Sequence, residues 1–222
     1  MRFSGFSEGV LRRTQLFELI ASGVKIPCED GVLIADDCQI GAGTLILPGC
    51  VIGAGCVIGE DCVVGPSSVL LDTTLGDGVE FLQSWAEGAG VESGAVVGPF
   101  ARLRPGAHIG REVKIGNYVE IKNSEIGQGS KVPHLSYIGD ADMGAGCNIG
   151  CGCATANYDG KRKHRTQLGS GCFIGCDTTL VAPVTLGERV YTAAGSVITQ
   201  DVPEKTLVIA RSRQVHKLDD RC

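Results

Sequence analysis

The 222-residue sequence has few aromatic side chains, no excess of positive charge and no long apolar run. Aromatic residues make up only 5% of it, so bulky rings cannot fill much of a core. The formal net charge of −5 provides no general attraction to nucleic acid or to an anionic membrane surface. No stretch approaches the roughly 20 apolar residues of a membrane-spanning helix, and residues 1–13 lack the apolar segment of a signal peptide. These absences favour a cytoplasmic protein with no nucleic-acid or membrane partner.

A six-residue period is the dominant pattern that is present, together with 33 glycines. Aliphatic residues recur at every sixth position, namely Ile34, Ile40, Ile46, Ile52, Ile58, Val64 and Leu70. A small residue follows each of them four positions later, namely Cys38, Thr44, Cys50, Cys56, Cys62, Ser68 and Thr74. The period slips near residues 75–90, resumes at Val97 and continues to Ile121, restarts at Ile126 and again at Met143, breaks at residues 155–167 and then continues to Ile198. Such a repeat indicates a solenoid.

Each six-residue unit is long enough for a short strand and a corner, so three units close one triangular coil of 18 residues. The aliphatic residue fills the interior of the coil, and the residue four positions later is small because it also points inward. Residues 34–202 correspond to about nine such coils. We therefore expect an all-β, parallel β-helix.

Seven of the eleven cysteines fall in the small inward position: Cys38, Cys50, Cys56, Cys62, Cys147, Cys153 and Cys172. A free cysteine at such a position acts as a compact apolar residue. Zinc sites usually contain closely spaced pairs such as CxxC, whereas these spacings are multiples of the repeat. The pattern predicts packing and no metal site.

The pattern divides the chain into three segments. Residues 7–23 have the apolar spacing of an amphipathic helix with a glycine after its end, which predicts a helical cap over residues 1–30. Residues 31–203 form the repeat domain. Residues 204–222 form a charged C-terminal tail, predicted to be a loosely packed strand or arm.

Three features on the outside of the coil can carry chemistry. Arg104 and Lys122 each follow an inward residue and lie one coil apart, so their charges should repel unless an anion lies between them. His134 occupies an outward position, where it is either an ordinary surface histidine or a functional one. The interruption at residues 155–167 contains five consecutive basic residues after a turn signal, which suits a phosphate-rich ligand or simply a solvated loop tip.

The motifs GPFARLRPG, IGNYVEIKN and GSKVPHLSYIGDADMG are more specific than the general repeat. From about residue 30 to residue 215 the sequence resembles the acetyltransferase half of the bifunctional bacterial enzyme that makes UDP-N-acetylglucosamine. This resemblance implies a left-handed parallel β-helix, a homotrimer with active sites between subunits, and acetyl-CoA as the acetyl donor. It also implies N-acetylation of glucosamine-1-phosphate, an amino-sugar phosphate.

The resemblance implies a role for each matching position. His134 matches the general base, Arg104, Lys122 and Tyr137 match residues that bind the sugar phosphate, and Asn148 matches a further sugar contact. The acetyl-CoA positions are Cys151, Asn157, Tyr158, Lys163, Cys176, Ala194 and Arg211. Cys151 replaces a common alanine and Cys176 a common serine, which puts donor affinity in question. The nucleotide-binding domain of the family has no counterpart here, so we expect neither uridyltransferase activity nor a magnesium site.

Three other interpretations compete with this one. A zinc carbonic anhydrase built on the same coil would need three histidines per metal, but the four histidines contain no pair five residues apart. A hexapeptide acyltransferase with another acceptor would keep one histidine without needing Arg104, Lys122, Tyr137 and Asn148 together. A non-catalytic scaffold or regulatory subunit would keep the coil and lose the chemistry.

Overall fold

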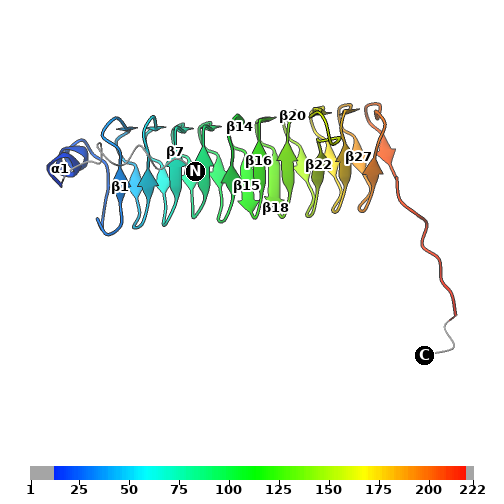
Figure 1. The fold of residues 1–222 in the computed structure, drawn as a ribbon, viewed down its shortest axis with the longest axis horizontal. Helices are drawn as coiled ribbons and strands as arrows, with labels where there is room; N and C mark the ends of the chain where they lie inside the picture. The colour runs from blue at the N-terminus through cyan, green and yellow to red at the C-terminus, as the bar shows by residue number, and fades with distance from the viewer. Residues whose placement is uncertain (1–12, 219–222) are drawn as a thin grey trace.

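The computed structural model describes residues 13–218, which form an elongated three-sided coil preceded by one helix (Figure 1). The helix α1 spans Arg13–Ala21 and packs Leu16 and Leu19 against the core of the coil. Gly23 follows its end with a φ of 103°, a conformation that glycine adopts without steric cost. The start of the predicted helix, residues 7–12, lies outside the described residues.

Three parallel sheets form the sides of the coil, and each strand pairs with the strand three places later. Sheet 1 contains β1 (Leu33–Ile34), β4 (Val51–Ile52), β7 (Val69–Leu71), β10 (Trp85–Glu87), β13 (Arg102–Leu103), β16 (Glu120–Lys122), β19 (Tyr137–Gly139), β22 (Ala154–Ala156), β25 (Thr179–Val181) and β28 (Val197–Ile198). Sheet 2 contains β2 (Gln39–Ile40), β5 (Val57–Ile58), β8 (Thr74–Leu75), β11 (Gly90–Val91), β14 (Ala107–Ile109), β17 (Ser124–Ile126), β20 (Ala141–Met143), β23 (Thr166–Leu168) and β26 (Val184–Leu186). Sheet 3 contains β3 (Leu45–Ile46), β6 (Val63–Val64), β9 (Glu80–Phe81), β12 (Val96–Val97), β15 (Lys114–Asn117), β18 (Lys131–His134), β21 (Asn148–Ile149), β24 (Phe173–Ile174), β27 (Tyr191–Thr192) and β29 (Leu207–Val208).

The predicted all-β parallel β-helix is confirmed, and its architecture is consistent with the left-handed coil that the resemblance implies. Sheets 1 and 3 each contain ten strands within the described residues, which is one more coil than the sequence predicts. Two features account for the difference. Strand β29 continues the coil into the segment predicted as a tail, and several coils are shorter than 18 residues.

The inward aliphatic residues form the core, as expected. Ile34, Ile46, Ile52, Ile58, Val64 and Leu70 are buried, while Ile40 is only half-buried. Six of the seven predicted inward cysteines are buried, and Cys38 is half-buried because it lies in the first coil. Their thiols donate hydrogen bonds to carbonyl oxygens, as Cys153 Sγ does to Gly175 at 3.1 Å. Burial raises the pKa of the Cys153 thiol to about 11, which keeps it neutral.

The prediction for Thr74 is wrong: it is exposed, and Thr73 occupies the small inward position. The reason is that the step between the inward residues Leu70 and Leu75 is five residues long. Four other steps are equally short, and each has one residue with a positive φ at its corner. These five corner residues are Asp72 (46°), Gln83 (43°), Gly88 (57°), Asn123 (45°) and Asp140 (50°). The shortening therefore begins before residues 75–90, and the two short steps in the second half are those at which the sequence restarts its period, at Ile126 and Met143.

Candidate active site

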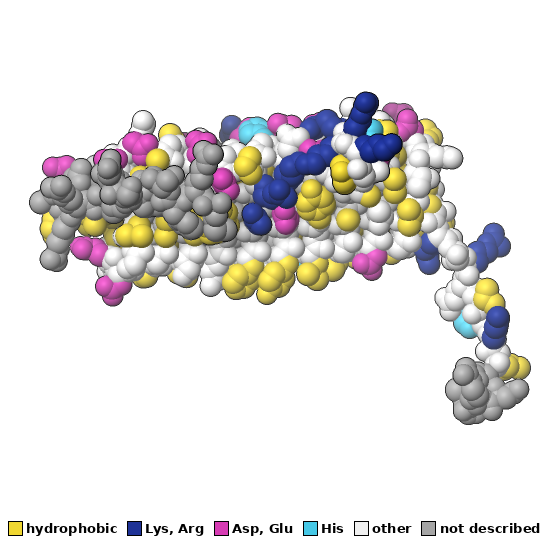
Figure 2. Space-filling model, in the orientation of Figure 1, with side chains coloured by type: hydrophobic (Ala, Val, Ile, Leu, Met, Phe, Trp, Pro, Cys, Tyr) yellow, Lys and Arg dark blue, Asp and Glu magenta, His cyan; other side chains and the backbone are white. Residues whose placement is uncertain are grey.

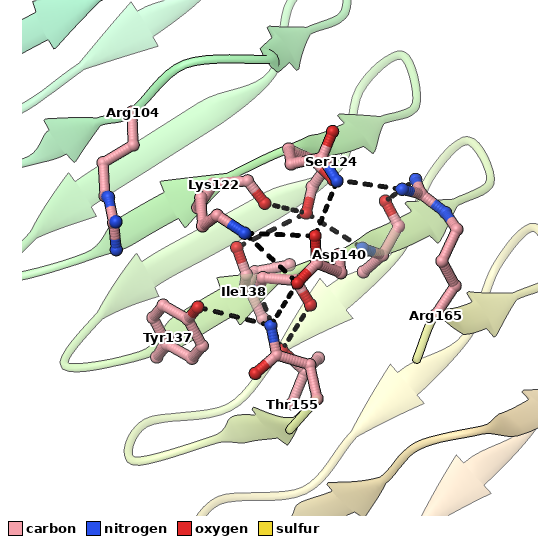
Figure 3. A network of polar contacts seen from close by, with 12 residues as sticks. Arg104, Lys122, Ser124, Tyr137, Ile138, Asp140, Thr155 and Arg165 are labelled. Carbon is pink, nitrogen blue, oxygen red and sulfur yellow. Dashed lines mark hydrogen bonds and ion pairs between the residues drawn. The ribbon is translucent and has the colours of Figure 1, made fainter. Parts of the chain in front are cut away.

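Arg104, Lys122 and Tyr137 lie on the outside of sheet 1, on three consecutive coils. Arg104 directly follows β13, Lys122 ends β16 and Tyr137 begins β19. These strands are neighbours in sheet 1, and Figure 3 shows the three side chains over it. The structure thus brings together the three residues that the resemblance assigns to the sugar phosphate.

Each cation on this face is paired with a carboxylate of the chain. Arg104 Nη1 donates to Glu120 Oε1 at 2.8 Å, and Lys122 Nζ donates to Asp140 Oδ1 at 3.2 Å. Sequence reasoning missed Glu120 and Asp140, although both lie inside the quoted motifs. Charge repulsion between stacked cations pointed to an anion without identifying which one, and the chain itself supplies two.

Asp140 accepts hydrogen bonds from three side chains and is only 4% exposed. Besides Lys122, the donors are Asn123 Nδ2 at 2.6 Å and Asn157 Nδ2 at 2.5 Å. Desolvation disfavours the ionised form of this carboxyl, but the hydrogen bonds outweigh it and hold the pKa of Asp140 below its usual value. Asp140 is therefore a buried carboxylate at the centre of the network in Figure 3.

Tyr137 reaches this network because of a glycine. Its hydroxyl lies 3.4 Å from Asn157 Nδ2, which can donate a hydrogen bond to it. A Cβ on Gly139 would overlap the Tyr137 hydroxyl and also crowd the amide of Asn157. The missing side chain thus allows the phenol ring to lie along β19 toward the next coil.

The interruption at residues 155–167 forms a hydrogen-bonded loop whose tip, residues 158–163, is exposed to solvent. Tyr158 and Lys163 form an antiparallel bridge. Asp159 accepts hydrogen bonds from the backbone N–H groups of Lys161 and Arg162, at 2.7 and 2.6 Å, and its Oδ2 lies 2.8 Å from His164 Nε2. These donors hold the pKa of the Asp159 carboxyl well below its usual range.

Two anchors fasten this loop to the coil. Asn157 binds Asp140 at one end of the loop, and Arg165 binds Asp142 at the other. The Arg165 guanidinium also donates to the carbonyl oxygens of Asn123 and Ala141, at 3.3 and 3.2 Å. The loop therefore covers the corner where Lys122 ends its strand.

Lys163 brings a third cation to this site. The nearby ammonium of Lys122 lowers the pKa of Lys163, and the charge on Arg104 lowers it to a smaller extent. The ion pair and hydrogen bonds with Asp140 act in the opposite direction on Lys122 and raise its pKa. Figure 2 shows a band of Lys and Arg side chains running over the central coils to the raised loop. Positive charge exceeds negative charge within this group, which suits a phosphate ligand.

His134 ends β18 in sheet 3, and its side chain is exposed as predicted. Within residues 13–218 its ring makes no hydrogen bond or ion pair. It is the second residue after the inward Val132, and Cys151, Cys176 and Ala194 occupy the same position on the next three coils. These four residues form a column along one corner of the coil, which we call the corner column. Backbone hydrogen bonds hold it in place: Asp177 N donates to Cys151 O and Gly195 N donates to Cys176 O, both at 2.7 Å.

The remaining predicted residues flank this column. Asn148 lies on β21, the neighbour of β18 in sheet 3. Arg211 follows β29, and its Cδ lies 3.8 Å from the position that a Cβ on Gly195 would take. The structure therefore divides the predicted donor residues into a corner group with Arg211 and a loop group formed by Asn157, Tyr158 and Lys163.

The described residues hold no group of three or more His, Cys, Asp or Glu side chains placed to bind a metal ion. Within residues 13–218, no helix is long and apolar enough to span a membrane. The site consists of the exposed imidazole of His134, the cationic side chains of Arg104 and Lys122 on sheet 1, and the basic loop at residues 155–167.

Comparison with known proteins supports the repeat and the motifs. The family model for the bacterial transferase hexapeptide (six repeats) matches residues 37–72, 88–123 and 165–200. The "Bifunctional protein GlmU" of Brevibacillus brevis is 47% identical over 213 residues, which cover 96% of this chain and 46% of that protein. The protein of the same name from Carboxydothermus hydrogenoformans is 47% identical over 99% of this chain and 49% of its own length. The chain thus spans about half the length of these relatives.

A solved structure shares the fold. The UDP-N-acetylglucosamine acyltransferase from Campylobacter jejuni aligns with a TM-score of 0.58 and 20% identity, covering 82% of this chain and 70% of its own. On the repeat, the parallel coil and the similarity along almost its whole length, this chain belongs to the hexapeptide-repeat family of bacterial transferases.

Proposed function

We propose that this protein transfers the acetyl group of acetyl-CoA to the amino group of glucosamine-1-phosphate, a step in UDP-N-acetylglucosamine biosynthesis. The observation that carries the proposal is the cationic group of Arg104, Lys122 and Lys163, one corner away from the exposed His134. Matching residues in the related GlmU proteins extend over nearly the whole chain. A cytoplasmic location remains a prediction.

The acceptor would bind over sheet 1. Arg104 and Lys122 hold its phosphate, because a guanidinium and an ammonium each form charge-assisted hydrogen bonds with phosphate oxygens. Tyr137 orients the sugar ring or bonds the same phosphate, and Asn148 contacts the sugar from sheet 3. This binding aims the amine at the corner column.

The donor would bind along the column and the loop. Cys151, Cys176 and Ala194 line the corner, and Asn157, Tyr158, Lys163 and Arg211 contact the coenzyme. Lys161, Arg162 and Lys163 carry the positive charge that a phosphate-rich coenzyme requires, on a loop whose backbone Asp159 holds in place. The residues present therefore fit acetyl-CoA.

His134 would act as the general base. The amine nitrogen attacks the thioester carbonyl carbon, the carbon–sulfur bond breaks, and the proton lost by the nitrogen passes to the imidazole. The imidazolium of His134 would then return this proton to the departing sulfur, so that coenzyme A leaves as the thiol and the base is regenerated. A backbone N–H near Cys151 can stabilise the developing oxyanion. A positioned base contributes roughly 10²–10⁴ in rate, and holding both substrates together contributes more.

A homotrimer would complete each site with residues from a neighbouring subunit. Phe100, Tyr118 and Leu135 occupy equivalent corner positions on three consecutive coils, and all are exposed. The first two rings stack with their centroids 5.6 Å apart. This apolar ridge adjoins His134, so a neighbouring copy packed on it would bury the edge of the site. Light scattering would measure the assembly.

The test is release of coenzyme A thiol together with the mass of the acetylated product, measured with a panel of amines. The panel contains glucosamine-1-phosphate, glucosamine-6-phosphate, glucosamine and galactosamine-1-phosphate. We expect glucosamine-1-phosphate to give the highest kcat/KM and unphosphorylated glucosamine the lowest. Preference for another amine would indicate a different acceptor, and no turnover with any of them would favour a non-catalytic role.

A further inference from the structure

Asp140 is the residue where the predicted acceptor and donor sites meet. Lys122 belongs to the acceptor set, Asn157 belongs to the donor set, and both donate hydrogen bonds to this one carboxylate. Asn157 also reaches the hydroxyl of Tyr137, a second acceptor residue. Asp140 is not among the residues to which the resemblance assigns a role.

We propose that Asp140 is a positioning residue that couples acceptor binding to donor binding by holding Lys122 and Asn157 in one buried hydrogen-bonded network. The inference rests on the proposed function, because it concerns the substrates of that reaction. Asp140 need not touch either substrate. It acts through the two side chains that it orients.

The burial of the network makes this coupling effective. The Asp140 side chain is 5% exposed and the Lys122 side chain 16%, so water competes little for their hydrogen bonds. A lysine side chain has several rotatable bonds, and fixing its ammonium in advance removes an entropic cost that substrate binding would otherwise include. A movement of Asp140 would displace Lys122 and Asn157 together.

The backbone of the coil explains why an aspartate is present. Asp140 occupies a five-residue corner with a φ of 50°, a conformation that aspartate, asparagine and glycine tolerate best. Asn123 occupies the equivalent corner one coil earlier, and its amide donates to Asp140 at 2.6 Å. The two short corners therefore stack polar side chains where the loop returns with Asn157.

Asp72 provides a matched control. It occupies the same five-residue corner between sheets 1 and 2, with a φ of 46°, but its side chain is exposed. The strand that precedes it, β7, lies three strands away from β16, which carries Lys122. Asp72→Asn and Asp140→Asn make the same chemical change in the same backbone conformation. Asparagine retains the shape and the φ preference, but it removes the charge and replaces one acceptor oxygen with an NH2 donor.

The experiment measures KM for glucosamine-1-phosphate and for acetyl-CoA, together with kcat, in both variants and in the wild type. We expect Asp140→Asn to raise both KM values roughly tenfold, the effect of losing a hydrogen bond to a charged group, with kcat lowered less. Asp72→Asn should change neither KM. Asn123→Gly keeps the corner conformation, removes one donor to Asp140 and should raise both KM values to a smaller extent.

A double variant tests the coupling itself. In an Asn157→Ala background, Asp140→Asn should raise the KM for acetyl-CoA by less than about twofold, because the side chain through which it acts is already missing. The KM for glucosamine-1-phosphate should still rise. If the two substitutions instead raise the KM for acetyl-CoA by the product of their separate effects, Asp140 does not act through Asn157. That result would overturn the coupling.

The outcomes separate this inference from the proposed function. An active wild type whose Asp140→Asn variant keeps both KM values, or changes only one of them, overturns the inference and leaves the function intact. A wild type inactive with both substrates overturns the function and the inference with it. Thermal unfolding of each variant, followed by circular dichroism, confirms that KM is measured on folded protein.

Discussion

The coils at residues 33–97 and those at residues 102–168 use the same backbone construction but differ in what their corners carry. Both stack parallel strands, bury one inward side chain in almost every strand and contain five-residue corners with positive φ. At the corner between sheets 1 and 2, the first region carries Asp72, whose side chain is exposed, and Gly88, which has no side chain. In the second region Asn123 and Asp140 at the same corners join one network. The coil geometry is therefore a scaffold, and the side chains at equivalent corners decide where a site forms.

The loop at residues 155–167 accounts for much of this difference. Steps between inward residues are five or six residues long throughout the first region, so residues 33–97 contain no longer loop that covers a corner. In the second region the longer step lets Asn157 and Arg165 reach back over two earlier corners. A buried polar network requires such cover, because an exposed one would exchange its hydrogen bonds with water.

The largest expected effect separates His134 from another exposed histidine. His134→Ala should lower kcat at least about a hundredfold, because a general base contributes that much, and should leave the fold and acetyl-CoA binding intact. His108→Ala is the control, since His108 lies on sheet 2 and is bonded to Glu125. The kcat of both variants is measured, and only His134→Ala should lose activity. An unchanged kcat in His134→Ala would remove this residue from the mechanism.

A second prediction separates two lysines on neighbouring strands of the chain. Lys122→Ala should raise the KM for glucosamine-1-phosphate roughly tenfold to a hundredfold, because a charged hydrogen bond to phosphate is lost. Lys114→Ala removes an exposed lysine on sheet 3 and should leave that KM unchanged. Steady-state kinetics with varied acceptor measures both. An unmoved KM in Lys122→Ala would contradict the phosphate assignment.

A third pair compares the two regions directly. Ile52 on β4 and Ile121 on β16 are fully buried at the same place in sheet 1. Replacing either by alanine should lower the free energy of unfolding by about 2–5 kcal/mol through lost burial and a cavity. Only Ile121→Ala should also raise the acceptor KM, because Lys122 is the next residue. Denaturant unfolding measures the loss of stability in each variant, and steady-state kinetics measures its acceptor KM. If the acceptor KM is the same in the two variants, core packing does not position Lys122.

A smaller effect concerns acid stability. The folded state holds the pKa of Asp140 below its usual value of about 4, so ionised Asp140 stabilises the fold above that pH. This stability is lost as the pH falls through the lower, folded-state pKa. The difference in melting temperature between wild type and Asp140→Asn should therefore narrow below about pH 4. A difference independent of pH would indicate that the charge of Asp140 does not stabilise the fold.

The smallest effect distinguishes cysteines by position. A maleimide should label the exposed Cys176 in the native protein and leave the buried Cys50, Cys56 and Cys62 unmodified. Peptide mass mapping identifies the labelled cysteines. Acetyl-CoA should slow labelling of Cys176 if that corner lines the donor site. Equal labelling with and without acetyl-CoA would place the donor elsewhere.

Much of the coil could be predicted because its information is local. The inward positions of Ile46, Ile52 and Val64 and the burial of Cys50 follow from size and spacing within a few residues. The corner residues of the five-residue steps were harder to predict from the sequence. Sequence shows only that the period slips, whereas the position of the slip depends on which residue adopts positive φ, and several polar residues can do so.

The amino-acid sequence by itself determined the triangular coil, its inward thiols and the outward exposure of His134, because a strict period of apolar and small residues has one compact solution. The tertiary structure alone decided which polar residues meet. Asp140 is 18 residues from Lys122, and Arg165 is 42 residues from Asn123, so their contacts exist only after coils stack and the loop folds back. Neighbours across stacked coils are set by the register of every intervening turn, and one residue more or less in a corner changes that register.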